Sequence, residues 1–364
     1  MRVFFSAGEA SGDAYAAELM TRIRSRLPET VFEGIGGRKL AALGCNPIDS
    51  SAWGSIGIPD ALRVGRNVLR GASRAKKMLS SGEPGLMIPI DFGFLNIRLA
   101  KYAKDRGWKV LYFIPPGSWK RHSQGSDLPG ITDLIVTPFS WSADILNEMG
   151  ANARWLGHPL LEMIGPSKHV DRKDQIAVLV GSRRNEISIN LPILAGIGGL
   201  LPQSFEFAVA PTVELWALRE AWSKLAPHRH SDTFTEDDTY GVFRRSQAAI
   251  VCSGTATLEA ALLDCPMAIF YKVSTLTALQ AVLLRMKPRW AGLPNILLQR
   301  DSIPEFVQDD ATPEKIVKAI LPLMLDSSER REQLEAFNEI RELLGPGTAL
   351  TGAADLACQL MSQM

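Results

Sequence analysis

Short apolar runs alternate with longer segments of helical periodicity along this chain, and the alternation occurs twice. In the first half, apolar runs at residues 3–6, 31–34, 86–90, 109–114, 133–137 and 153–156 alternate with helical patterns at 13–26, 61–79, 95–106 and 141–149. In the second half, the runs lie at 176–180, 205–210, 248–252 and 267–271, with helical patterns at 186–197 and 255–263 and a helical tail from 313 onward. Strands that alternate with helices of about 10–15 residues form parallel sheets covered on both faces. The sequence therefore predicts an α/β fold with two doubly wound, Rossmann-like domains.

A break in the alternation separates the two halves. Gly165 and Pro166 lead into a charged stretch at residues 171–174, which is typical of a linker. A chain of 364 residues is long enough for two cores of ordinary size. We expect an N-terminal domain over 1–165, a linker over 166–174, a second domain over 175–345, and a final helical segment within 346–364. Doubly wound sheets bind ligands at the carboxyl ends of their strands, so we expect a cleft between the two domains.

Charge, cysteines and hydropathy exclude several classes of protein. The formal net charge is +1, which argues against a nucleic-acid binder. The four cysteines are scattered without CxxC or metal-ligand spacing, which favours a reducing cytosol and predicts no metal site. The chain starts directly with a strand-like run, so we expect no signal peptide. No apolar run approaches the roughly 20 residues of a spanning helix, so membrane contact is expected to be peripheral.

The turn after the first strand carries the first candidate site. It reads Ala7-Gly8-Glu9-Ala10-Ser11-Gly12-Asp13 and opens the first helix. Glycines allow a ligand to approach the backbone closely, and amides at a helix start bind anions or hydroxyls. The alternative is a tight turn capped by Ser11. Glu9 favours a ligand site, because a carboxylate has no obvious capping role there.

Two segments of the second half have the same arrangement, a glycine-containing turn between a strand and a helix. They are Gly181-Ser182-Arg183, and Ser253-Gly254-Thr255 with Glu259 four residues later. A guanidinium beside helix-start amides suits a diphosphate, and a carboxylate one turn into the helix can accept both hydroxyls of a ribose. The alternatives are a surface pair of Arg183 with Arg184, and a capping box between Thr255 and its acidic first turn.

Two further polar residues follow central strands of the first half. Asp91 ends the apolar run 86–90, where its carboxylate should project into the cleft, although it can also serve as the N-cap of the next helix. His158, in Gly157-His158-Pro159, ends the last strand of that half. Histidines at such positions are more often structural than catalytic.

The helical segment 61–79 carries two stripes. One is apolar, and the other consists of Arg63, Arg66, Arg70, Arg74 and Lys77 without an intervening acidic residue. A charged stripe is usually a solvated face. An unmixed basic stripe also suits anionic lipid headgroups, so we expect peripheral membrane contact here.

The motifs follow one another in a recognisable order over nearly the whole chain. They are residues 7–13, Gly34-Ile35-Gly36-Gly37, Ile90-Asp91 with Asn96, Pro116 with Trp119, Pro138-Phe139, Gly157-His158-Pro159-Leu160, Gly181-Ser182-Arg183 with Glu186, residues 253–259, Pro266-Met267, Pro294-Asn295, and Pro304-Glu305 with Gln308. Together they resemble the lipid-A-disaccharide synthase family of GT-B fold glycosyltransferases. The single motifs are weak, but the ordered set is specific.

The resemblance implies a reaction that needs no cofactor. The family transfers 2,3-diacylglucosamine from its UDP derivative to the 6-hydroxyl of 2,3-diacylglucosamine 1-phosphate, with inversion, at the cytoplasmic face of the inner membrane. Such a displacement needs a base for the hydroxyl proton and positive charge for the leaving UDP. The resemblance places UDP-sugar at the two second-half segments together with Asn295 and Gln308. It places the acceptor near Gly8, Ser11, Gly12 and Asn96, and it implies a homodimer with exchanged C-terminal segments, so the final helix should pack on the N-terminal domain or on a partner chain.

The chain departs from the family pattern at the catalytic segment. The family commonly has a second aspartate three residues after the first, where this chain has Phe94. That aspartate is a leading candidate for the family's base, so we expect Asp91, and in second place Glu9, to take its role. Val180, Ser140 and the residues around the matching Pro116 and Trp119 also differ from the pattern. Two alternatives therefore stay open: a related enzyme on another UDP-sugar, and a UDP-sugar-binding protein with impaired catalysis.

Overall fold

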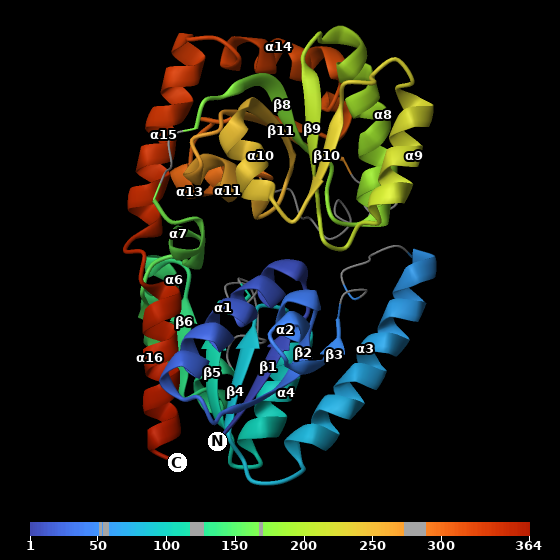
Figure 1. The fold of residues 1–364 in the computed structure, drawn as a ribbon. Helices are drawn as coiled ribbons and strands as arrows, with labels where there is room; N and C mark the ends of the chain where they lie inside the picture. Colours follow the sequence, from blue (N-terminus) through green and yellow to red (C-terminus); the bar gives the residue numbers. More distant parts are fainter. Residues whose placement is uncertain (51–52, 54–57, 117–126, 167–169, 273–288) are drawn as a thin grey trace. The chain divides into compact units, whose positions relative to one another are not determined.

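The computed structural model describes residues 1–50, 53, 58–116, 127–166, 170–272 and 289–364, which form two compact units. Unit 1 comprises Met1–Met163 with Leu344–Met364, and unit 2 comprises Ile164–Leu343. Each unit contains its own parallel sheet (Figure 1), so the prediction of two doubly wound α/β domains is confirmed. The unit limits differ from the expected ones at both ends of unit 2, and residues 167–169 of the expected linker lie outside the described residues.

Within the described residues, unit 1 has a seven-stranded sheet in the order β3-β2-β1-β4-β5-β6-β7. The strands are β1 (Arg2–Ala7), β2 (Val31–Gly36), β3 (Asn46–Asp49), β4 (Leu86–Ile90), β5 (Lys109–Phe113), β6 (Leu134–Thr137) and β7 (Ala153–Trp155). The helices are α1 (Ala10–Arg26), α2 (Arg38–Ala42), α3 (Ile58–Leu79), α4 (Gly93–Lys104), α5 (Leu128–Ile131), α6 (Ser140–Glu148), α7 (Pro159–Ile164) and α16 (Ala349–Ser362).

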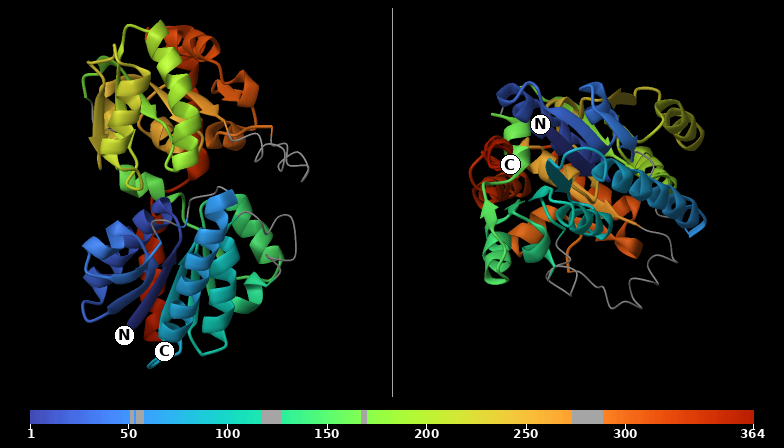
Figure 2. Two further views of the ribbon diagram at one scale, coloured as in Figure 1. Left: turned by 90° about the vertical axis from the view of Figure 1, so that its right-hand side faces the viewer. Right: turned by 90° about the horizontal axis from the view of Figure 1, so that it is seen from below.

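The helices of unit 1 cover both faces of its sheet (Figure 2). On one face α1 and α16 contact the strands from β2 to β5, and on the other α4 contacts β4 and β5 while α3 contacts β2 and the edge strand β3. The second face buries Phe4, Met87 and Tyr112 against Leu99 of α4. Continuous apolar strands are expected where both faces of a parallel sheet are covered, which explains the unbroken apolar run of β4.

Within the described residues, unit 2 has a six-stranded sheet in the order β10-β9-β8-β11-β12-β13. The strands are β8 (Lys173–Leu179), β9 (Ser204–Val209), β10 (Thr233–Glu236), β11 (Ser246–Cys252), β12 (Met267–Tyr271) and β13 (Glu305–Val307). The helices are α8 (Arg184–Leu200), α9 (Leu215–Leu225), α10 (Thr239–Arg245), α11 (Ala256–Leu262), α13 (Leu293–Leu298), α14 (Pro313–Leu323) and α15 (Ser328–Leu344). A short 3₁₀ turn, η2 (Gln308–Asp310), follows β13.

The final helix belongs to unit 1 although it follows unit 2 in the sequence. Helix α16 packs on α1 of the same chain. Glu162 caps it by accepting bonds from the amide of Leu350 at 2.5 Å and from the Thr351 hydroxyl at 2.5 Å. The returning chain passes close to Gly157, where a Cβ would lie 1.6 Å from the Pro346 carbonyl oxygen and where φ is +88°. Glycine is therefore required at that crossing.

Candidate functional site

The carboxyl edge of the unit 1 sheet brings two carboxylates together. Strands β1 and β4 pair with Ala7 opposite Ile90, so Glu9 and Asp91 follow neighbouring strand ends. Asp91 and Phe92 both have left-handed backbone, with φ of +46° and +49°. Phe92 rather than Asp91 is the N-cap residue of α4, so Asp91 does not have the capping role that was its alternative.

The Asp91 carboxyl group sits in an environment that favours its protonated form. Burial first, and then the nearby Glu9 carboxylate, raise its pKa to about 6 against the lowering effect of the Phe92 amide. A carboxylate of this pKa is mostly ionised at neutral pH yet a better proton acceptor than an ordinary aspartate, as a general base requires.

Asn96 lies beneath this edge and not on its surface. Its side chain is 0% exposed. Its amide nitrogen donates to the carbonyl oxygens of Ser6 at 2.9 Å, Ile90 at 3.0 Å and Asp91 at 2.8 Å. The Ser6 hydroxyl donates to its amide oxygen at 2.6 Å. Asn96 therefore ties the ends of β1 and β4 together and fixes the Asp91 backbone. Its buried side chain presents no group to an acceptor sugar.

The first glycine of this turn serves packing. A Cβ at Gly8 would lie 2.3 Å from the Phe92 ring, whereas one at Gly12 would make only an ordinary contact with Ala7 at 3.4 Å. The N-cap residue of α1 is Glu9, with no side-chain capping bond, so the turn is not capped by Ser11. Gly8 thus allows the turn to pack against Phe92 and leaves Glu9 at the strand edge.

The segment after β8 in unit 2 holds an ion pair. Gly181 has φ of +107°, and Arg183 is the N-cap residue of the 17-residue helix α8. The Arg183 guanidinium lies 3.1 Å from Glu186, which also accepts from the Ser182 amide at 3.3 Å. Glu186 thus orients the Arg183 loop. From the sequence alone, Glu186 is only a position that matches the family, because acidic residues are common in the first turn of any helix.

The segment after β11 lies against the Arg183 loop. A Cβ at Gly181 would be 3.6 Å from the Cys252 sulfur. Below both, the buried Asn190 donates to the Val180 carbonyl at 2.9 Å and contacts the Cys252 sulfur at 3.4 Å. The two segments therefore share one edge of the sheet, where the carboxyl ends of β8 and β11 meet.

The capping-box alternative for the Ser253 segment is wrong. Thr255 is the N-cap residue of α11 but makes no side-chain capping bond. The Ser253 hydroxyl donates instead to the Ala291 carbonyl at 2.6 Å, and its amide donates to Phe270 at 3.1 Å. Gly254 is exposed, and Glu259 lies partly buried in the first turn of α11.

Asn295 and Gln308 differ in what they can offer a ligand. Asn295 is 1% exposed and donates to the Ile303 carbonyl and to Glu305, while its amide oxygen accepts from the amides of Ser302 and Ile303. All of its bonding capacity is used within the fold. Gln308 directly follows β13, with φ of +56°, and is partly exposed at the carboxyl edge.

His158 is buried in the turn that meets the returning chain. Burial lowers its pKa to about 4. Its Nδ1 accepts from the Leu160 amide at 3.2 Å, and its own amide donates to Leu344 at 2.9 Å. These contacts give it a structural role. Trp119, another matched position, lies outside the described residues.

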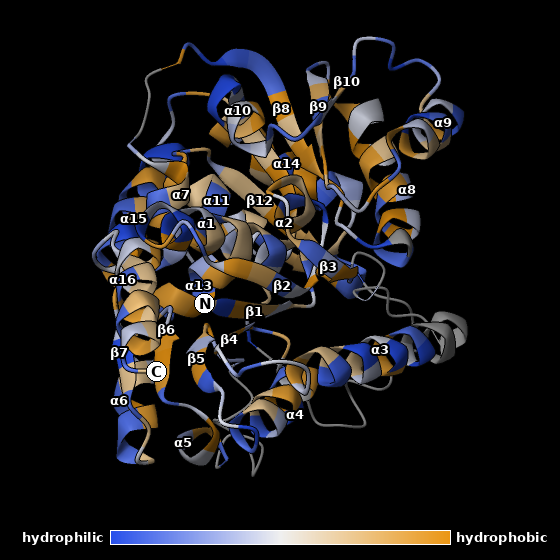
Figure 3. Ribbon diagram, turned by 60° about the horizontal axis from the view of Figure 1, so that its bottom comes forward, coloured by the Kyte–Doolittle hydropathy of each residue, from blue (hydrophilic) through white to orange (hydrophobic). Residues whose placement is uncertain are grey.

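The predicted basic stripe lies on α3. The side chains of Arg66, Arg70, Arg74 and Lys77 are exposed, while that of Arg63 lies outside the described set. Hydrophilic residues recur along this helix in Figure 3. The apolar Leu69 of the same helix is 69% exposed. Gly71, Ala75 and Leu79 face the core.

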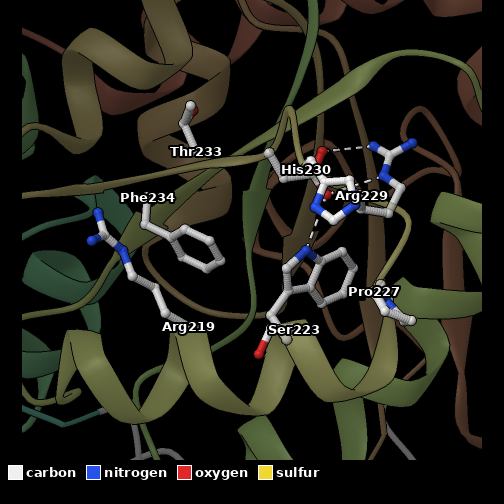
Figure 4. A pocket seen from close by; sticks show the side chains of 10 residues that line it. Arg219, Ser223, Pro227, Arg229, His230, Thr233 and Phe234 are labelled. Carbon is white, nitrogen blue, oxygen red and sulfur yellow. Dashed lines mark hydrogen bonds and ion pairs between the residues drawn. The ribbon is translucent and has the colours of Figure 1, made fainter.

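A cavity of about 670 Å³ lies at the opposite edge of the unit 2 sheet (Figure 4). Its walls include Trp222, Arg229 and Phe234, from the end of α9 to the start of β10. Asp232 accepts from Trp222 at 3.0 Å and pairs with Arg229 at 2.9 Å. Because this cavity lies at the amino ends of the strands, it is not the place where sheets of this kind bind nucleotides. Within the described residues no cluster of His, Cys, Asp or Glu could hold a metal ion.

Comparison with known proteins identifies a family along nearly the whole chain. The model of a family described as lipid-A-disaccharide synthetase matches residues 3–353. A lipid-A-disaccharide synthase of Trichlorobacter lovleyi is 31% identical over 383 residues, covering 100% of this chain and 98% of that protein. One of Syntrophus aciditrophicus is 30% identical over 378 residues, covering 99% and 98%.

Solved structures show the same fold at low sequence identity. Arabidopsis thaliana UGT89C1 complexed with UDP superimposes with a TM-score of 0.64 at 12% identity, covering 99% of each chain. CalG4, the calicheamicin glycosyltransferase, gives a TM-score of 0.57 at 14% identity, covering 100% of this chain and 98% of that one. These similarities show the GT-B fold.

Proposed function

Because the chain belongs to the lipid-A-disaccharide synthase family, we propose that it transfers 2,3-diacylglucosamine from UDP to the 6-hydroxyl of 2,3-diacylglucosamine 1-phosphate. The products are a β-1′,6-linked disaccharide and UDP. The observation that carries this function is the match to the family over residues 3–353, which spans both units.

Unit 2 holds the UDP-sugar at the carboxyl edge of its sheet. Arg183, next to the first amides of α8, stabilises the diphosphate as it leaves. The adjoining Ser253 segment lines the same edge, Glu259 binds the ribose, and Gln308 contacts the nucleotide-sugar. Asn295 acts indirectly, by holding the residues around it, since its amide is fully bonded within the fold.

Unit 1 supplies the base. Asp91 takes the proton of the acceptor hydroxyl, and Glu9 raises its basicity. Asn96 holds together the strand ends that these carboxylates follow, which supports Asp91 as the base although the family's second aspartate is Phe94 here.

An assay with purified protein tests the reaction. Incubation with UDP-2,3-diacylglucosamine and 2,3-diacylglucosamine 1-phosphate should yield the disaccharide and UDP in equal amounts. The Glu332→Gln variant, altered at an exposed residue of α15, should match it. Binding of UDP without disaccharide would instead identify a binding protein, and activity regained in Phe94→Asp would assign the loss to the missing carboxylate.

We propose that the protein acts at the inner face of the cytoplasmic membrane, which it contacts peripherally through α3. The exposed Arg66, Arg70, Arg74 and Lys77 support this, together with the exposed Leu69. Among the described residues, no helix is both long enough and apolar enough to cross a bilayer. A homodimer is implied by the resemblance and stays a prediction that light scattering can test.

A further inference from the structure

The backbone of Ala291 is held from two sides by side chains of the donor edge. The Glu305 carboxylate at the start of β13 accepts from the Ala291 amide at 2.7 Å. The Ser253 hydroxyl, in the turn after β11, donates to the Ala291 carbonyl at 2.6 Å. One peptide segment thus links the start of β13 to the turn that lines the proposed UDP site.

Asn295 holds the other oxygen of Glu305. Its amide nitrogen donates to Glu305 Oε1 at 2.7 Å, and its remaining bonds go to Ser302 and Ile303. A buried amide with every bond made fixes its neighbour rigidly. Glu305 therefore has both oxygens committed to groups of the fold, one to Asn295 and one to Ala291.

The backbone leaves space for this contact at Gly292. A Cβ there would lie 2.8 Å from Glu305 Oε1 and 2.5 Å from the Ile269 side chain. Strand β13 pairs with β12 through Glu305 opposite Ile269, so the carboxylate is delivered from a strand of the sheet. A group held by strand pairing and by a buried amide is a rigid support for a neighbouring segment.

We propose that Glu305 is a positioning residue for UDP-sugar binding, which acts through the Ala291 peptide on the Ser253 turn. It does not touch the substrate. By anchoring Ala291, it fixes the acceptor of the Ser253 hydroxyl and so the orientation of the residues that face the nucleotide. The proposal rests on the proposed function, because it concerns the same donor site.

The test begins with UDP binding by calorimetry. Glu305→Gln keeps the size of the side chain but leaves one of its two N–H partners without an acceptor. UDP affinity should fall about tenfold, the equivalent of one hydrogen bond to a charged group. The rate at saturating donor should change less than KM. Glu332→Gln, an exposed carboxylate of the same unit, should bind UDP as the wild type does.

A double-mutant cycle distinguishes positioning from general weakening. Ser253→Ala removes the hydrogen bond to the Ala291 carbonyl. If Glu305→Gln does not fold, this variant alone tests the role of the Ala291 peptide. If both residues act through Ala291, the double variant should lose little more than the worse single variant, whereas independent effects would add. Hydrogen exchange in peptides covering 289–298 should also be faster in Glu305→Gln.

The outcomes separate this proposal from the function it rests on. Wild-type protein that does not bind UDP overturns the proposed donor site. Wild-type protein that binds UDP, with Glu305→Gln binding equally well, overturns the role of Glu305 alone. Additive losses in the cycle do the same, because they would show that Ser253 and Glu305 are not linked through Ala291.

Discussion

At the scale of single residues, the protein stabilises its charged groups unequally. Arg229 and Asp232 form a pair with both side chains almost wholly buried, so each compensates the other. Among the described residues Asp91 forms no ion pair, and it lies instead near another carboxylate, that of Glu9. Groups whose environment disfavours their charge mark functional sites more often than structural ones.

Replacing Asp91 by Asn should stabilise the folded protein and slow the reaction. The folded-state pKa, about 6, lies above the ordinary 3.8, so the ionised carboxylate costs stability above pH 6 and the cost disappears below pH 3.8. Asp91→Asn should therefore gain at most about 3 kcal/mol at pH 8 and almost nothing at about pH 3. The transfer rate should fall by about 10²–10⁴-fold. Thermal unfolding at both pH values and initial-rate assays measure these effects.

The wild-type pH profile provides the control for that prediction. The kcat/KM should fall on the acid side below about pH 6, because Asp91 must be ionised to accept a proton. Glu9→Gln should shift this limb to lower pH, since it removes a like charge, with a smaller loss of rate. A larger loss in Glu9→Gln than in Asp91→Asn would transfer the role of base to Glu9.

Arg183 should contribute to nucleotide binding through its charge. Arg183→Ala should weaken UDP binding by about 1.5–3 kcal/mol, as for hydrogen bonds to charged groups. Calorimetric titration measures this, with Lys224→Ala as a control whose side chain is 71% exposed in a surface pair with Glu220. Unchanged affinity in Arg183→Ala would remove this residue from the site.

At the scale of elements, α3 has two faces with different tasks. Its inner residues pack on the sheet and on α4, whereas its outer face carries the basic Arg66, Arg70, Arg74 and Lys77. A charge-mediated contact with lipid is screened by salt, while burial of Ala75 and Leu79 is not. This division allows the outer face to be altered without unfolding unit 1.

Membrane binding should follow the charge of α3. Replacing Arg66, Arg70 and Arg74 by Gln should reduce binding to anionic vesicles, with about 1 kcal/mol lost for each charge removed near the surface. Vesicle sedimentation at low and high salt measures this, with Lys315→Gln on α14 as a charge control. Equal binding of the wild type to neutral and anionic vesicles would show that α3 is only a solvated face.

At the scale of the whole molecule, the last helix stabilises the unit that is made first. Buried residues of α16, Ala353, Ala357 and Met361 among them, complete the core on the α1 side of unit 1. Unit 1 is therefore incomplete until the chain has passed through unit 2 and returned.

Met361→Ala should destabilise unit 1 selectively. Loss of a buried methionine costs about 2–5 kcal/mol. Hydrogen exchange should accelerate in peptides covering β4 and β5 but not in those covering β8 and β11, since the two sheets belong to different units. Gln359→Ala, exposed on the same helix, is the control. Acceleration in both units alike would mean that they unfold as one.

The sequence by itself determined the fold class and most central elements. Strands β4 and β12 coincide with the predicted ranges, and α1 and α8 differ only at their ends. These elements are buried on both sides or have a long apolar stripe, so their periodicity is strong. The edge strands β3, β10 and β13 were not predicted. They are only three or four residues long, too short for a clear periodic pattern, and pairing with a neighbouring strand makes them strands.

The sequence also predicted which polar residues lie at the carboxyl edges of the sheets, because residues that follow parallel strands share one edge. It placed Asp91, Glu9, Arg183 and Ser253 at strand ends, and the structure has them there. Which of these side chains remain available to a ligand was decided only by tertiary contacts. Asn96 and Asn295 are buried, and their amide groups bond to backbone or side-chain groups that are close in space. A motif records the order of polar groups along the chain, whereas hydrogen-bond satisfaction depends on partners brought together by folding.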